Sequence, residues 1–137
     1  MARVISKFIM GIIILPALFN ISGCVNNIST GNSGLLEGRI SIGPICPVES
    51  DPPRPECLPT AETYKAYPVG IWTPDGKRKI TQISPALDGS YIVILDPGQY
   101  LVKLEKDNIG GSNLPIIIEL GSSDKITLNI DIDTGIR

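Results

Sequence analysis

The stretch that decides the fold class is Asp88–Leu104, DGSYIVILDPGQYLVKL. Before its Pro-Gly pair, Tyr91, Val93 and Leu95 occupy alternate positions, and apolar alternation resumes after the pair. A hydrophobic period of two is typical of β-strands, and proline followed by glycine suits the two central positions of a type II turn. The stretch therefore predicts two β-strands joined by a type II turn.

The first of these two strands is apolar on its second face as well. Ile92 and Ile94 lie between the alternating residues and leave the strand without a charge. A strand that is apolar on both faces is typical of a central position in a sheet that is covered on both sides. We therefore expect it to be a central strand.

The same period extends over most of the chain from residue 35 onward. Five further strands are expected, at residues 36–42, 67–71, 80–84, 116–120 and 126–132. Turn residues separate several of them, as in Thr73–Gly76, where Pro-Asp-Gly follows the threonine. No run of ten or more residues has a helical period. Seven short strands in a chain with 14 glycines and 12 prolines predict an all-β protein, and we favour a β-sandwich over a small barrel.

Several of these turn and core residues resemble a known family. The Asp88-Gly-x-aromatic and Pro97-Gly-x-Tyr motifs are similar to those of carboxypeptidase regulatory-like domains, and so are residues 38–44 and 133–137. The resemblance covers residues 35–137 and implies the seven-stranded Greek-key sandwich known as transthyretin-like or prealbumin-like. It implies little about chemistry, because fold does not determine function.

The N-terminus has the layout of an export signal. Arg3 and Lys7 precede twelve uncharged, mostly apolar residues at positions 8–19. That run is too short for a membrane-spanning helix, which needs about 20 residues, but it suits the apolar core of a signal peptide. It ends in Ile-Ser-Gly-Cys, which resembles the lipobox of bacterial lipoproteins and covers residues 1–24.

The lipobox resemblance implies how the chain is processed. A signal peptide of residues 1–23 would be removed, and Cys24 would carry a diacylglyceryl group with fatty acids such as palmitate. Residues 24–34, rich in Asn, Ser and Gly, would form a flexible tether. The protein would then be anchored to a membrane on its extracytoplasmic side, in the cell envelope.

The remaining two cysteines, Cys46 and Cys57, lie in a proline-rich segment. Residues 43–59 contain six prolines and no apolar period. Disulfides persist in exported proteins, so we expect a Cys46–Cys57 bridge. A zinc site is the rival interpretation, but two thiols in a chain without histidine make a poor one. The segment is either a stiff recognition surface or an ordered crossover between strands.

Composition argues against several functions. The chain has no histidine and a net charge of −2, and Lys77–Lys79 is its one notable basic cluster. We predict no catalytic residue, no metal site, no cofactor and no nucleic-acid partner. The expected function is a non-enzymatic binding, structural or accessory module with an envelope protein or glycan partner. The alternative is a carbohydrate- or peptidoglycan-binding module that uses Trp72 and the 46–57 loop, and a hydrolase that uses carboxylates alone is a third possibility.

Overall fold

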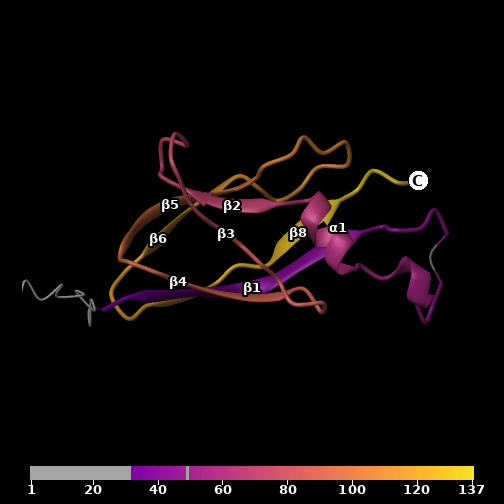
Figure 1. The fold of residues 1–137 in the computed structure, drawn as a ribbon, viewed down its shortest axis with the longest axis horizontal. Coiled ribbons are helices and arrows are strands. Elements are labelled where there is room, and N and C mark those ends of the chain that lie inside the picture. The colour runs from indigo at the N-terminus through magenta and orange to yellow at the C-terminus, as the bar shows by residue number, and fades with distance from the viewer. Residues whose placement is uncertain (1–31, 49) are drawn as a thin grey trace, which may run out of the picture.

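The computed structural model describes residues 32–48 and 50–137, and the predicted signal peptide and Cys24 lie outside these residues. Two β-sheets face each other along the long axis of the domain (Figure 1). In chain order the elements are β1 (Gly34–Gly43), η1 (Pro55–Cys57), α1 (Ala61–Ala66), β2 (Val69–Trp72), β3 (Lys79–Gln82), β4 (Ser90–Leu95), β5 (Gly98–Leu104), β6 (Ile116–Leu120), β7 (Lys125–Thr127) and β8 (Ile130–Asp133). The predicted all-β sandwich is confirmed in its coarser features, because the described chain is mostly β, with two sheets and little helix.

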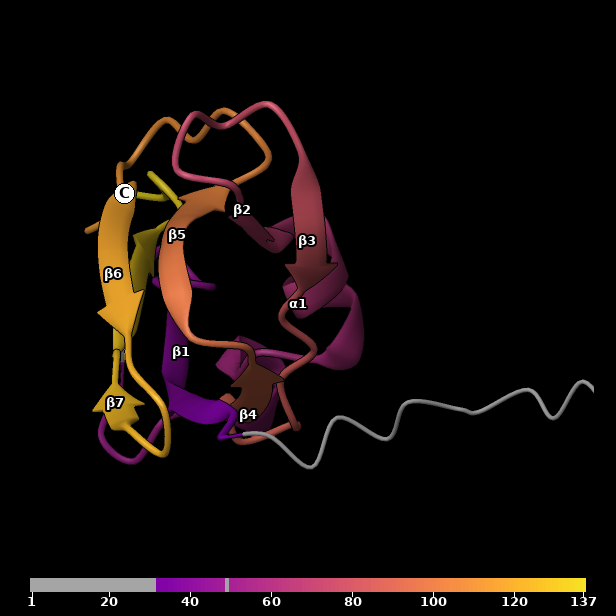
Figure 2. The same ribbon diagram turned by 90° about the vertical axis from the view of Figure 1, so that its left-hand side faces the viewer.

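The two sheets have four strands each. In the first sheet, β1 lies between β4 on one side and β7 and β8 on the other, antiparallel to β4 and parallel to β7 and β8. The second sheet has the order β3-β2-β5-β6 and is antiparallel throughout. Figure 2 views the sandwich along its long axis, with β3 and β4 on the side away from β6 and β7.

The core lies between the sheets and is apolar. Within the described residues no polar or charged side chain is fully buried, apart from the phenol of Tyr91. The buried residues are those at the inward positions of the predicted alternation: Leu36, Ile40, Ile42, Val69, Ile71, Ile83, Tyr91, Leu95, Val102, Ile118, Leu120, Ile130 and Ile132. Burial of this apolar surface is the main stabilising contribution to the fold.

The prediction that β4 is a central strand is wrong. Among the described residues β4 pairs with β1 alone, so it forms the edge of its sheet. Its inward residues are buried or half-buried, but Ile92 and Ile94 are 67% and 71% exposed. A strand that is apolar on both faces looks the same in sequence whether a partner covers its second face or not.

The type II turn predicted after β4 is also absent. Gly98 does not have the positive φ that the third position of such a turn requires, and it is already the first residue of β5. The connection is held instead by Tyr100, whose hydroxyl donates to the Asp96 carbonyl oxygen at 2.6 Å. The turn at Thr73–Gly76 is present, with the Gly76 N–H donating to the Thr73 carbonyl at 2.8 Å.

The strand expected at residues 126–132 is interrupted, which makes eight strands and not seven. Between β7 and β8 the Leu128 carbonyl leaves the ladder and accepts a hydrogen bond from the Tyr91 hydroxyl at 2.6 Å. The Asn129 side chain replaces the missing backbone acceptor, because its Oδ1 accepts from the Arg39 N–H at 3.1 Å. Gly38 makes this possible, since a Cβ there would overlap the Leu128 carbonyl.

The sequence did not predict the short helix α1. Thr60 caps it, accepting a hydrogen bond from the Thr63 N–H at 3.3 Å while Thr63 Oγ1 accepts from the Thr60 N–H. The helix ends at Ala66 with Tyr67 as its C-cap, so β2 begins at Val69, two residues later than the sequence predicted. None of the helices in the described part of the chain is long and apolar enough to span a membrane.

Candidate functional site

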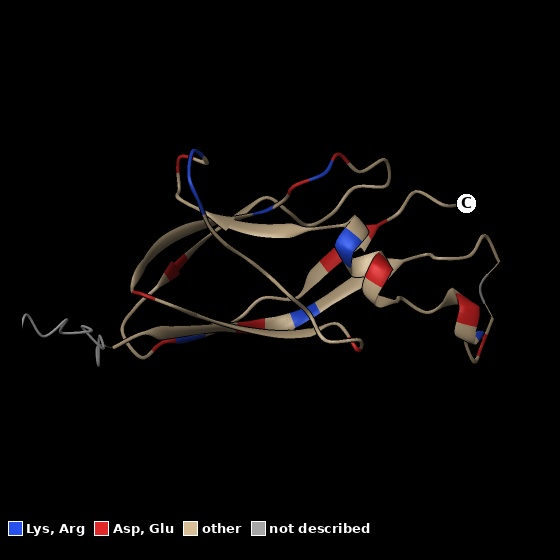
Figure 3. Ribbon diagram, viewed as in Figure 1, with Lys and Arg blue, Asp and Glu red and all other residues tan. Residues whose placement is uncertain are grey.

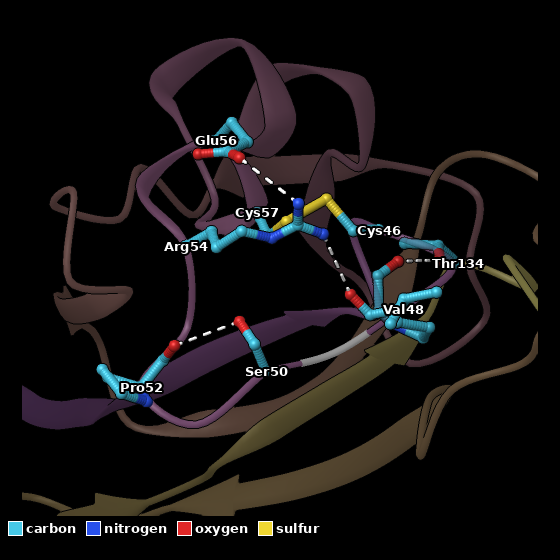
Figure 4. The surroundings of a disulfide bond; sticks show 9 residues. Cys46, Val48, Ser50, Pro52, Arg54, Glu56, Cys57 and Thr134 are labelled. Atoms are coloured by element: carbon cyan, nitrogen blue, oxygen red, sulfur yellow. Dashed lines mark hydrogen bonds and ion pairs between the residues drawn. A yellow bond between two sulfur atoms is a disulfide. The ribbon is translucent and has the colours of Figure 1, made fainter.

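The proline-rich segment leaves β1 at Gly43 and is closed by a disulfide between Cys46 and Cys57 (Figure 4). The two Cα atoms lie 5.4 Å apart. The predicted pairing is therefore present. We call residues 46–57 the disulfide loop.

The described residues of the disulfide loop make few other interactions. Arg54 forms an exposed ion pair with Glu56 at 3.7 Å, and its guanidinium lies 3.5 Å from the Val48 carbonyl oxygen (Figure 4). Ser50 Oγ donates to the Pro52 carbonyl at 3.1 Å. Exposed ion pairs contribute little to stability, so the bridge and the prolines are the main constraints on the loop.

The base of the disulfide loop is tied to the C-terminal segment. The Thr134 N–H donates to the Gly43 carbonyl at 3.0 Å, and the Thr134 hydroxyl donates to the Pro44 carbonyl at 2.5 Å. The Asp133 carboxylate in turn accepts hydrogen bonds from the Gly135 N–H and from Arg137. The loop therefore projects from a fixed base at the end of the sandwich.

A cleft of about 760 Å³ lies next to the disulfide loop. β1 contributes Arg39 and Ser41, α1 contributes Tyr64, and the connection between β3 and β4 contributes Leu87 and Asp88. A second cavity of about 230 Å³ is lined by both cysteines of the loop. The two cavities share Ile42 and Leu58, so the loop and the cleft form one surface.

The charged groups of the cleft belong to a turn. Asp88 Oδ1 accepts hydrogen bonds from the Ser90 hydroxyl at 2.6 Å and from the Ser90 N–H at 3.0 Å, and these bonds lower the pKa of Asp88. Arg39 lies 3.8 Å from the same carboxylate in an exposed ion pair. Tyr64 donates to the Leu87 carbonyl at 3.4 Å, and partial burial raises its pKa. This arrangement suits binding of a polar ligand better than proton transfer.

Two other carboxyl groups with shifted pKa values also stabilise turns. The pKa of Asp75 is lowered by hydrogen bonds from the Thr73 hydroxyl and the Lys77 N–H. The pKa of Asp133 falls to about 2 because Arg137 and the Gly135 N–H donate to its carboxylate. No group of three or more cysteine or acidic side chains is placed to hold a metal ion in the part of the chain that the structure describes.

Trp72, the predicted ligand contact, is the last residue of β2 and is half-buried on the outer face of the second sheet. Lys103 Nζ lies 4.0 Å from the centroid of its ring, and its buried Nε1 has no hydrogen-bond partner within the described residues. β2 runs away from α1 and the disulfide loop toward the β2–β3 turn (Figure 1). The structure therefore does not bring Trp72 and the disulfide loop together.

The cleft was not foreseen from the sequence. Arg39 lies in the strand expected at residues 36–42, whereas Tyr64 lies in the helix that the sequence did not predict. Residues of β1, α1 and the β3–β4 connection meet through the tertiary fold, and no spacing in the sequence signals that meeting.

No protein-family model matches the chain, and no curated protein matches it. Solved structures do. A DUF3823 family protein from Parabacteroides merdae is 15% identical with a TM-score of 0.44, covering 73% of this chain and 45% of its own. The minor pilin of Streptococcus agalactiae is 15% identical with a TM-score of 0.50, and the alignment covers 76% of this chain and 45% of the pilin. The major pilin subunit of Bacillus cereus is 11% identical with a TM-score of 0.36, and the alignment covers 72% of this chain and 28% of the pilin subunit.

The likeness to the minor pilin is one of fold alone. The aligned region spans less than half the length of each of these three proteins. At this identity the comparison supports a β-sandwich domain of the kind found in pilins, and it assigns no residue a role.

Proposed function

We propose that this protein is a non-enzymatic, lipid-anchored module of the cell envelope that acts as a binding, structural or accessory domain. Residues 1–23 are its signal peptide, Cys24 carries the lipid, and residues 24–34 tether a carboxypeptidase regulatory-like sandwich to the extracytoplasmic side of a membrane. Its partner is an envelope protein or glycan, contacted through the disulfide loop and the neighbouring cleft.

The observation that carries this proposal is the course of β1. The strand begins at Gly34, the last residue of the proposed tether, and ends at Gly43, three residues before the disulfide loop. Ten residues at roughly 3.4 Å each separate the two ends by about 30 Å. In Figure 1 the start of β1 and the loop lie at opposite ends of the long axis. The anchor thus leaves the loop free to contact a partner.

The electrostatics support a non-enzymatic role. The shifted carboxyl groups, Asp75, Asp88 and Asp133, all have lowered pKa values because they accept hydrogen bonds within turns. A general acid at neutral pH needs a raised pKa. Groups of this kind stabilise backbone turns and hold their negative charge.

Metabolic labelling with radioactive palmitate tests the anchor. The wild-type chain should incorporate label and sediment with membranes, whereas Cys24→Ser should remain an unprocessed, unlabelled precursor. The matched control is the Cys46→Ser/Cys57→Ser pair, which removes two thiols but leaves Cys24 and should be labelled like the wild type. Equal labelling of wild type and Cys24→Ser would overturn the lipid assignment.

Carbohydrate or peptidoglycan binding is the second candidate. One observation favours it: Trp72, Leu101 and Ile117 are direct neighbours across β2, β5 and β6, and they form a row on the outer face of the sheet. Aromatic and apolar rows can stack on sugar rings. A glycan array in which binding disappears in Trp72→Ala but persists in Ile109→Ala would support this candidate, and no binding by the wild type would reject it.

A further inference from the structure

The β4 edge of the first sheet is apolar and unprotected. Its sequence, SYIVIL, contains no charge and no proline, and in Figure 3 the β4 ribbon is uncoloured between the acidic turns at its ends. Ile92 and Ile94 are 67% and 71% exposed, and Val93 on the inner face is only half-buried. Natural edge strands are usually shielded by charges, proline, bulges or a covering segment.

The antiparallel ladder shows which backbone groups are free. The Ile40 N–H donates to the Gly89 carbonyl at 2.8 Å, so that pair is hydrogen-bonded. Bonded pairs recur every second residue, which directs the backbone groups of Tyr91, Val93 and Leu95 toward β1. The N–H and C=O of Ile92 and Ile94 therefore point to the open side, where no described residue pairs with them.

The open segment has defined ends. At one end the Ser90 N–H donates to Asp88 Oδ1 and the Ser90 carbonyl accepts from the Ala86 N–H, so both groups are occupied. At the other end the Asp96 carbonyl accepts the Tyr100 hydroxyl. Between these two ends each molecule offers two donors and two acceptors, the N–H and C=O groups of Ile92 and Ile94.

We propose that the β4 edge binds the β4 edge of a second copy of this chain, in antiparallel orientation with Val93 opposite Val93 of the second copy. In this register Ile92 of each copy faces Ile94 of the other as a hydrogen-bonded pair. Four N–H···O=C bonds then satisfy all the free groups of both edges. The result is a two-fold dimer in which the two first sheets become one continuous sheet.

The side chains are self-complementary in the same register. On the outer face, the exposed isoleucines of the two copies pack against each other as cross-strand pairs. Ser90 comes opposite Asp96 of the second copy, and Arg39 is the neighbour of Ser90 on β1. An arginine side chain can span the intervening strand, so each Arg39 has an acidic partner in the other molecule. Because the dimer is two-fold symmetric, this pairing of Arg39 with Asp96 of the second copy occurs twice.

The length and position of the chain outside the structure also fit this dimer. Gly34 pairs with Leu95, two residues from the proposed axis, so both copies of β1 begin near the centre of the dimer. From strand spacings the two Gly34 Cα atoms lie about 20 Å apart. In each copy the eight residues 24–31, which lie outside the described part of the chain, can span up to about 26 Å. Both tethers can therefore reach one membrane, while the disulfide loops lie at the two outer ends.

Cysteine crosslinking of the full-length protein in intact cells tests the register. Val93→Cys places two thiols opposite each other at a non-hydrogen-bonded pair, about 4.5 Å apart between Cα atoms, which is within disulfide range. We expect a dimer band on a non-reducing gel that disappears with reductant. Ser90→Cys is the matched control on the same strand, with its two copies about 20 Å apart, and should stay monomeric. The wild-type protein in the adjacent lane shows any dimer band that Cys24 produces without the new cysteine.

A second pair of variants tests the surface without relying on a disulfide alone. Adding Ile92→Lys to Val93→Cys should reduce the dimer band by about tenfold or more, because lysine at an edge opposes strand pairing. Adding Ile117→Lys, which places the same change on the second sheet, should leave the band intact. A monomeric Val93→Cys protein, equal crosslinking by Ser90→Cys, or equal loss in both lysine variants would overturn the proposal. Because the proposal does not depend on a lipid at Cys24, loss of palmitate labelling leaves it standing.

Discussion

The two edges of the first sheet are built differently. The β8 edge is covered by residues 108–114: Asn113 exchanges hydrogen bonds with the backbone of Asp131 and donates to the Asn129 carbonyl, and the Gly111 carbonyl accepts from the Asp133 N–H. This edge is also broken between β7 and β8 and carries charges. The β4 edge has none of these features and exposes Ile92 and Ile94.

The contrast suggests different roles for the two edges. β1 is the shared neighbour of both, so the same strand supports a closed edge and an open one. An open apolar edge invites pairing with another strand, and a closed one prevents it. Gly38, Tyr91 and Asn113 support the β7–β8 side of the sheet, and substitutions at these three positions compare their contributions.

Gly38→Ala should have the largest effect. Its new Cβ would overlap the Leu128 carbonyl, a backbone atom that cannot rotate away. Displacing this carbonyl would disrupt the connection between β7 and β8. We expect a loss of about 3 kcal/mol in the free energy of unfolding. Urea denaturation followed by circular dichroism measures it.

Gly43→Ala is the control for this change. It lies on the same strand, but nothing in the described structure comes within 4 Å of its added Cβ. Its free energy of unfolding should stay within about 0.5 kcal/mol of the wild type. If the two alanine variants were equally stable, the close approach of Leu128 to β1 would be ruled out.

Tyr91→Phe should have an intermediate effect. The variant loses the hydroxyl that donates to Leu128, at a cost of about 2 kcal/mol for the unpaired carbonyl. Burial raises the pKa of Tyr91 to about 12, while the unfolded phenol ionises near 10. The unfolded state therefore releases its proton first, and wild-type stability falls as the pH rises from 10 to 12.

The pH dependence separates this contribution from a general loss of packing. Stability curves of wild type and Tyr91→Phe should differ most below pH 10 and converge toward pH 12. Raised pKa values at Tyr64 and Tyr100 leave a smaller alkaline slope in both proteins. Parallel curves across this range would contradict a buried, hydrogen-bonded phenol at position 91.

Asn113→Ala should have the smallest effect on stability. It removes two side-chain hydrogen bonds that cover β8, at a net cost of about 1 kcal/mol. Amide hydrogen exchange at Asp131 should become faster, because Asn113 Oδ1 is the acceptor of that N–H. Gln99→Ala, which removes an exposed amide with no hydrogen bond in the described structure, should change neither. Unchanged exchange at Asp131 would show that Asn113 does not protect the edge.

Much of the fold follows from local patterns in the sequence. Apolar alternation located the strands around Leu36, Ile71, Val102 and Ile118, and all four are buried or nearly so in the core. The two cysteines that remain after Cys24 form the expected disulfide. These predictions succeed because period-two burial and short-range pairing depend on neighbours in the chain.

The other features depend on contacts between distant residues. The break in the last strand requires Gly38, Tyr91 and Leu128 to meet, and these lie far apart in sequence. The cleft likewise requires α1 to pack beside Arg39 and Asp88. No local pattern encodes such meetings, so the candidate site could not be assembled from the sequence.

The alternation of apolar residues and the two neighbouring cysteines were enough to predict a β-protein with an apolar core and a disulfide loop. The three-dimensional structure was needed to show that the most apolar strand lies at an edge and that the disulfide loop follows the end of β1 opposite Gly34. The hydrophobicity of a side chain determines whether its burial is favourable. The order of strands in a sheet determines whether that side chain is buried.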